Sequence, residues 1–248
     1  MSAIWQMRAR YGTGDHLKLN KRKCSISIEL VPCGADFLKV VLSIGNDSHT
    51  FWASSVMGNQ FSSFVGAVYQ LYTEKYDTHS HNRGIDSKAK HICPQEDPSL
   101  LNDEEKVMSH VCWDGEGVLF HITFTRKRIF CGDRVSDEED LIEIGIGNPD
   151  DHQDTYTVDG RDLCYAVAKA YTEAIKKYGF YGYYSSTGGN CNGFGDVIDI
   201  HMILFIKAYA LGAMDARRLE TVWKKENSWM RAEGTSFDKE LELLLFDM

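Results

Sequence analysis

The feature that most constrains the fold of this chain is an internal repeat. When the sequence is compared with itself at an offset of 102 residues, apolar positions, turn residues and a helical stripe coincide without a gap. The aligned positions of the first copy are Val40, Leu42, Ile44, Gly45, Asn46, Val56, Gly58, Phe61, Val65 and Tyr69, and those of the second are Ile142, Ile144, Ile146, Gly147, Asn148, Val158, Gly160, Leu163, Val167 and Tyr171. Self-similarity at a fixed offset indicates a repeated supersecondary unit. The sequence therefore predicts an internal duplication.

Each copy has the pattern of three strands followed by a helix. In the first copy, residues 24–30 and 37–44 are rich in β-branched side chains and are separated by a Pro-Cys-Gly turn, which predicts two antiparallel strands. Residues 50–53 are the third expected strand. The helix that follows is predicted from apolar residues at helical spacing, namely Phe61, Phe64, Val65, Val68 and Tyr72.

The second copy repeats this order. Strands are expected at residues 118–124, 140–146 and 155–157. Asp159 is placed to cap a helix that carries Asp162 at its third position. The apolar stripe of this helix consists of Leu163, Ala166, Val167, Ala170 and Tyr171. The prediction is an α+β fold with antiparallel sheets, in which the two units are related by a pseudo-two-fold axis.

The rest of the chain is expected to connect and cover these units. Residues 77–103 are polar and lack periodicity, which indicates a long connection. The helix at 196–217 is apolar on nearly every side, so it is buried either between the repeats or against a partner chain, which would make a dimer. We divide one compact domain into a first unit with a basic amino-terminal segment and the polar linker (1–103), a second unit (104–180), and a Gly/Tyr-rich loop with helices, including one at 237–246 (181–248).

Composition places the chain among folded cytoplasmic proteins. Hydrophobic residues make up 43% and charged residues 25% of the sequence, and no apolar run approaches the ~20 residues of a membrane span. Arg8 and Arg10 stand where a signal peptide would have its apolar stretch. The seven cysteines include no C-x-x-C pair, which favours free thiols in a reducing compartment.

The net charge of -9 is concentrated in the second copy. Half of the 36 acidic side chains lie within residues 96–162. Because such a surface repels phosphate backbones, we do not expect nucleic acid as a partner. Because no apolar run is long enough for a membrane span, we do not expect a membrane as a partner either. The acidic candidates for binding a partner are Glu138, Glu139, Asp140, Asp150 and Asp151, although a solvated face that only aids solubility explains the same charges.

Two constellations have the residue types of catalytic or metal chemistry. Cys191, in a glycine-rich loop before a helix, is a candidate nucleophile with His201 as its base. The plainer alternative is a packing thiol in a loop, and Asp199 and His201 cannot both face it from one helix. We expect no metal site. The alternative is a metal site in the linker, formed by four residues whose spacing matches no common zinc motif: His79, His81, His91 and Cys93. We expect no cofactor.

A third element, Cys-Trp-Asp-Gly-Glu-Gly at 112–117, precedes the first strand of the second copy. Trp113 and Glu116 either form a recognition loop, or Trp113 closes the core. A hairpin, a helix and then Trp113, Glu116 and Gly117 resemble families of bacterial toxin-immunity proteins and the uncharacterised bacterial domains found near them. This chain departs from the family pattern at one point, because Gly117 follows Glu116 directly where we expect an intervening proline. The resemblance implies an acidic, non-enzymatic binding protein that neutralises a basic toxin domain; the alternative is a Cys191-dependent hydrolase or transferase.

Overall fold

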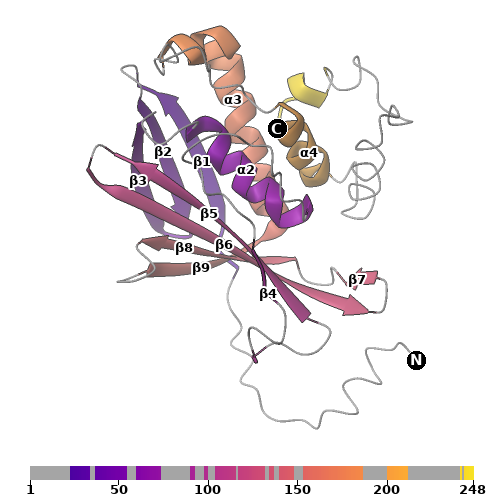
Figure 1. Ribbon diagram of the computed structural model, residues 1–248. Coiled ribbons are helices and arrows are strands. Elements are labelled where there is room, and N and C mark those ends of the chain that lie inside the picture. The colour runs from indigo at the N-terminus through magenta and orange to yellow at the C-terminus, as the bar shows by residue number, and fades with distance from the viewer. Residues whose placement is uncertain are drawn as a thin grey trace.

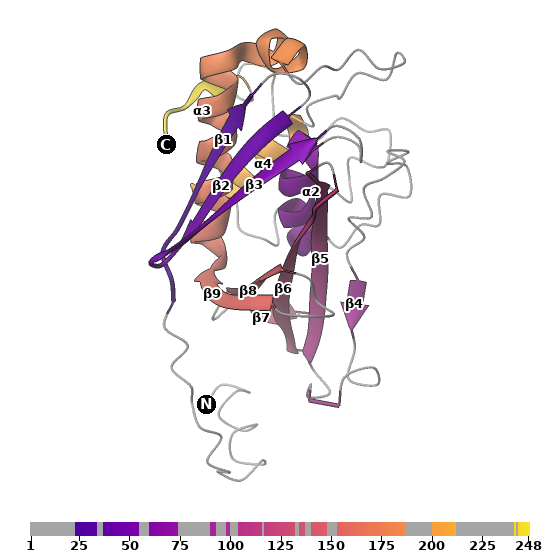
Figure 2. The same cartoon turned by 90° about the vertical axis from the view of Figure 1, so that its left-hand side faces the viewer.

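The computed structural model describes residues 23–33, 37–54, 60–73, 90–92, 98–99, 104–115, 117–131, 134–136, 140–147, 153–186, 200–211, 241 and 243–248. It confirms the α+β class. Two antiparallel sheets are set at an angle, and three helices lie together on the inner side of both (Figures 1 and 2). None of the described helices is long and apolar enough to cross a membrane.

The first sheet is a three-stranded meander of β1 (Ile26–Pro32), β2 (Phe37–Ile44) and β3 (Asp47–Ser54). Strand β2 alternates because one of its faces meets the core. Its inward side chains Leu38, Val40, Leu42 and Ile44 are completely buried, and the residues between them are partly exposed. The β2–β3 turn places Gly45 at a φ of 62°, a conformation that favours glycine.

The second sheet has six strands and is built around a long hairpin. Its elements are β4 (Lys90–Ile92), β5 (Glu104–Asp114), β6 (Leu119–Cys131), β7 (Arg134–Ser136), β8 (Leu141–Gly147) and β9 (Gln153–Asp159). The order is β4-β5-β6-β8-β9, and β7 pairs with the end of β6. The two sheets touch where Cys24 forms a parallel bridge with Val158, and the Cys24 amide donates to the Thr157 carbonyl at 2.9 Å.

The helices are α2 (Gln60–Thr73), α3 (Gly160–Ser186) and α4 (Ile200–Ala210). Asp159 caps α3 as predicted, because its Oδ1 accepts from the Arg161 amide at 2.9 Å and from the Asp162 amide at 3.4 Å. Gly179, at a φ of 66°, interrupts α3 with a kink. Helix α4 packs one side against α3 and α2, whereas Ile200 and His201 are exposed, so the described part of the predicted 196–217 helix is buried on one side and not all round.

Both predicted units have the order strand, strand, strand, helix. The segment β1-β2-β3-α2 follows it, and so does β6-β8-β9-α3 apart from the short β7 between β6 and β8; the aligned strands β2 and β8 are each the middle strand. The registers differ, since Ile44 pairs with Asp47 whereas Ile146 pairs with Asp154. Each helix also packs mainly on the sheet of the other unit: α2 packs on β5 and β6, and α3 packs on β1. Duplication therefore stays a prediction.

Three strands depart from the sequence prediction, and one of them, β7, pairs with the end of β6. Strand β4 lies inside the segment 77–103, which was expected to be a connection, and it pairs with β5 in antiparallel register. Strand β5 was not predicted as a strand at all. It pairs with β6 along its whole length, from Glu104 opposite Ile129 to Asp114 opposite Leu119.

Candidate functional site

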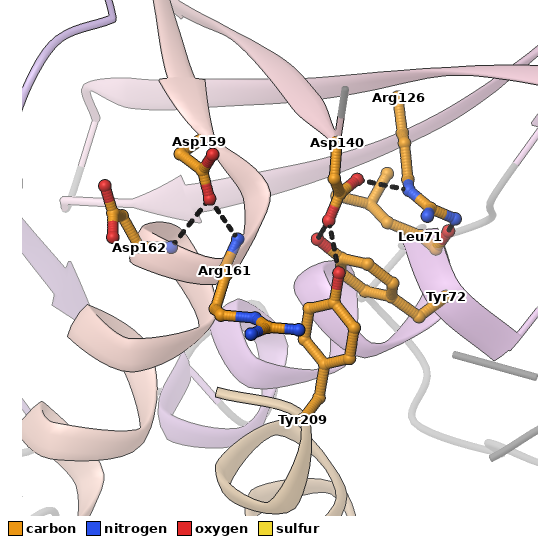
Figure 3. A network of polar contacts seen from close by, with 8 residues as sticks. All are labelled: Leu71, Tyr72, Arg126, Asp140, Asp159, Arg161, Asp162 and Tyr209. Atoms are coloured by element: carbon orange, nitrogen blue, oxygen red, sulfur yellow. Dashed lines mark hydrogen bonds and ion pairs between the residues drawn. The ribbon is translucent and has the colours of Figure 1, made fainter. Parts of the chain in front are cut away.

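The densest polar cluster among the described residues is centred on Asp140, just before β8 (Figure 3). Its Oδ1 accepts from Arg126 Nε of β6 at 2.7 Å. Its Oδ2 accepts from the hydroxyl of Tyr72 in α2 at 2.9 Å and from that of Tyr209 in α4 at 2.6 Å. We call these four residues the Asp140 cluster. One carboxylate thus joins a sheet to two helices.

Arg126 occupies a core position of β6. The inward residues of this strand are Ile122, Phe124 and Arg126, and Arg126 is only 3% exposed. Its guanidinium lies 4.4 Å from the ring centre of Tyr72, and Nη1 donates to the Leu71 carbonyl at 3.5 Å. That carbonyl lies in the last turn of α2, where a cation is favoured by the helix dipole. The ion pair with Asp140 offsets the cost of burying the Arg126 charge.

The first turn of α3 closes the cluster from another side. The Gly160 amide donates to the Asp140 carbonyl at 2.7 Å. A Cβ at this glycine would lie 2.2 Å from Asp140 Oδ2 and 2.4 Å from the Tyr72 hydroxyl, so a larger residue would have to displace these two side chains. The next residue, Arg161, places its guanidinium 5.6 Å from the ring centre of Tyr209 (Figure 3).

Burial keeps the neutral members of this region protonated. It raises the pKa of Tyr72 well above the ordinary value, and the Cys164 and Asp140 side chains add to the rise. The pKa values of Tyr209 and Cys164 are also raised, first by burial and then by the Asp140 carboxylate. The tyrosines therefore act as hydrogen-bond donors at neutral pH. With three donors on its carboxylate, Asp140 is suited to holding elements together.

This placement corrects the role predicted for Asp140. Its side chain is 11% exposed and is neutralised by Arg126, so it does not belong to a solvent-facing acidic surface. The apolar run of β8 begins directly after it and draws the carboxylate inward. The other predicted acidic contacts lie outside the described residues, namely Glu116, Glu138, Glu139, Asp150 and Asp151.

Trp113 is a core residue at the end of β5 and not a surface anchor. It is 2% exposed, and its Nε1 donates to Ser63 Oγ in α2 at 2.7 Å. Its ring contacts Phe51 and Phe64, with centroids 5.8 and 5.9 Å away. Of the two interpretations, the structure agrees with the one in which Trp113 closes the core. The prediction that Trp113 is a partner-binding residue is therefore corrected.

The residues proposed for chemistry are only partly described. Cys191, His79, His81 and Cys93 lie outside the described residues, and of His91 only the backbone in β4 is described. His201 lies on the exposed side of α4, with its ring 5.8 Å from that of Tyr69. Within the described part of the chain, no three His, Cys, Asp or Glu side chains are placed to hold a metal ion.

Sequence reasoning missed an exposed apolar group at the tip of the β5–β6 hairpin. Trp52 of β3 is 45% exposed, and Val118 and Leu119 are each 56% exposed. The two segments lie side by side, because a Cβ at Gly115 would be 2.8 Å from the Trp52 carbonyl oxygen and 3.4 Å from that of Val118. Strand alternation was the available signal: with Phe51 buried, Trp52 must face outward. We call these three residues the Trp52 patch.

The thiols give a first testable prediction. Among the described cysteines, Cys24, Cys33, Cys112 and Cys164 form no disulfide bond. Cys33 is exposed, whereas burial raises the pKa of Cys164 and encloses it completely. We expect Ellman's reagent to modify Cys33 in the native protein and Cys164 only after unfolding, and all seven cysteines of the sequence to react in denaturant. Peptide mapping assigns the sites; native labelling of Cys164 would contradict the enclosure.

Comparisons with known proteins give no relative: no protein-family model, no characterised protein and no solved structure is significantly similar to this chain.

Proposed function

We propose that this protein is a protein-binding module that contacts its partner through the Trp52 patch. The observation that carries the proposal is an exposed tryptophan on a strand whose backbone lies beside the hairpin that carries two exposed aliphatic residues. Contiguous exposed apolar side chains mark interaction sites on folded proteins. Tryptophan is also the residue type most enriched among those that dominate binding energy.

The core supports the patch from below. Phe51, which precedes Trp52, packs against Trp113 and Phe120, with ring centroids 5.8 and 5.6 Å away. The hairpin turn is held by the Gly115 amide, which donates to the Val118 carbonyl at 2.8 Å. Lys39 of the neighbouring strand lies 5.9 Å from the Trp52 ring. A surface that is ordered before binding loses less entropy in the complex.

The partner that best suits the charge of this chain is a basic protein. With 36 acidic against 27 basic side chains, the chain attracts cations at long range. A more specific version of this proposal is that the partner is a basic toxin domain, which this protein neutralises in the cytoplasm. This version is based on the resemblance to immunity proteins. The lack of a disulfide bond at the four described cysteines supports a reducing compartment. Any charge-reversal test must leave Asp140 unchanged, because that carboxylate stabilises the fold.

The test begins with a photo-crosslinking amino acid at position 52, which identifies the partner in the source cells. With the purified partner, Trp52→Ser is expected to weaken binding by about 30-fold, the loss of a hot-spot side chain worth about 2 kcal/mol. Calorimetry or surface plasmon resonance measures the change. A basic partner is expected to associate more slowly as salt is added.

The matched control is Tyr165→Ser. Tyr165 is an aromatic residue of α3 with similar exposure, 39%, and it lies outside the patch. Its replacement should change the dissociation constant by less than about two-fold. Equal affinity of wild type and Trp52→Ser for the partner would sink the proposal that this patch is the interface.

A further inference from the structure

Lys207 is a completely buried lysine in α4. An ammonium group has three protons to donate, and Lys207 has three acceptors for them. Thr172 Oγ1 of α3 lies 3.1 Å from Nζ, and the carbonyl oxygens of Leu244 and Phe246 lie at 3.2 and 2.6 Å. The cation therefore connects the segment 243–248 to two helices.

The segment 243–248 is attached mainly through polar groups. Besides the bonds to Lys207, Asp247 forms an ion pair with Lys176 of α3, and the Asp247 carboxylate is largely exposed. Leu245 and Phe246 are 55% and 52% exposed, whereas Met248 packs against the core. With two of its large side chains turned outward, this segment gains little apolar burial for its length.

Burying the Lys207 cation is unfavourable in itself. Desolvation, followed by the repulsion of Lys176, lowers the pKa of Lys207 to about 8, and Asp247 acts in the opposite direction. These are the charged groups that face Lys207 from α3 and from the segment; α2, which also contacts α4, contains no charged residue. The carbonyl acceptors must offset this cost, and the segment supplies two of the three acceptors.

We propose that residues 243–248 form a releasable strap that Lys207 holds closed over α3 and α4. The closed state depends on a few polar contacts with one ammonium group and not on extensive apolar packing. Such a segment opens locally, with a free energy below that of global unfolding. This proposal is independent of the Trp52 patch.

Hydrogen–deuterium exchange on the full chain tests the strap. In the wild type, the amides of 243–248 are expected to exchange faster than the core amides of α3 and α4. Lys207→Met keeps the length of the side chain but removes the three donors, so it should accelerate exchange in 243–248 by about 10-fold or more, as expected for losing hydrogen bonds from a charged group. The amides of α3 and α4 should be unaffected.

Two further variants keep the test decisive. Thr172→Val removes an acceptor of Lys207 outside the strap, which leaves the ammonium under-satisfied, and it should accelerate strap exchange by a smaller factor than Lys207→Met. Lys169→Met removes an exposed lysine of α3 that pairs with Glu173 at 3.9 Å, and it should leave strap exchange unchanged. The proposal is overturned if strap amides exchange together with those of α3 and α4 in the wild type, or if neither Lys207→Met nor Thr172→Val accelerates them.

Discussion

Replacing Asp140 with alanine is expected to lower the free energy of unfolding by about 3–5 kcal/mol, the typical cost of breaking a buried ion pair by removing one partner. The variant leaves Arg126, 3% exposed, without its counter-charge. It also leaves the hydroxyls of Tyr72 and Tyr209 without their acceptor. Urea denaturation followed by circular dichroism measures the loss.

Two companion variants identify the cause. Glu29→Ala removes an exposed carboxylate from β1 and is expected to change stability by less than about 0.5 kcal/mol. Replacing Asp140 and Arg126 together by apolar residues should recover part of the loss, because no charge is then buried alone. An Asp140→Ala protein within about 1 kcal/mol of wild type would mean that the Asp140 cluster does not hold these elements together.

Much of the fold was predictable because apolar periodicity reports which face is buried. The inward residues of β2 alternate without exception, and the stripe of α2 is buried at every position that the spacing identified. The cap at Asp159 was also predictable, because it depends only on neighbours along the chain. These signals are local.

Strand β5 escaped prediction because its inward pattern contains a polar residue. Its buried positions are Val107, Ser109, Val111 and Trp113. Ser109 is tolerated there since its hydroxyl donates to the Ala67 carbonyl of α2 at 2.8 Å. That acceptor lies 42 residues away in the sequence, so the pattern alone reads as an irregular polar stretch.

The Asp140 cluster was hidden for the same reason. Within its acidic run, Asp140 looks like a surface residue, and its partners Tyr72 and Tyr209 are 68 and 69 residues away. The usable signal was Arg126, a cation at an inward position of a β-branched and aromatic strand. A buried arginine at this position needs a buried acidic partner. The sequence thus predicts that such a partner exists, but it does not show which acidic residue it is.

The buried tyrosines give the second large prediction, an alkaline loss of stability. Burial raises the pKa of Tyr72, Tyr171 and Tyr209 in the folded protein; Asp140 adds to the rise at Tyr72 and Tyr209, and the Val65 amide opposes it at Tyr171. Above about pH 10 the unfolded chain releases these protons while the folded protein retains them, so the free energy of unfolding falls as pH rises. These three tyrosines together contribute about -4 kcal/mol per pH unit to the slope.

The measurement is urea denaturation at several pH values, combined with tyrosinate absorbance of the native protein. Lys207 acts with the opposite sign: its pKa of about 8 in the folded protein lies below the unfolded value, so its contribution to stability rises with pH up to about pH 10.5. The fall in the free energy of unfolding that the tyrosines cause is therefore measured above about pH 10.5. Tyr171→Phe removes one titrating group and should make the slope less steep by about 1.4 kcal/mol per pH unit. If all tyrosines ionised while the native circular dichroism persisted, burial would not hold these hydroxyls protonated.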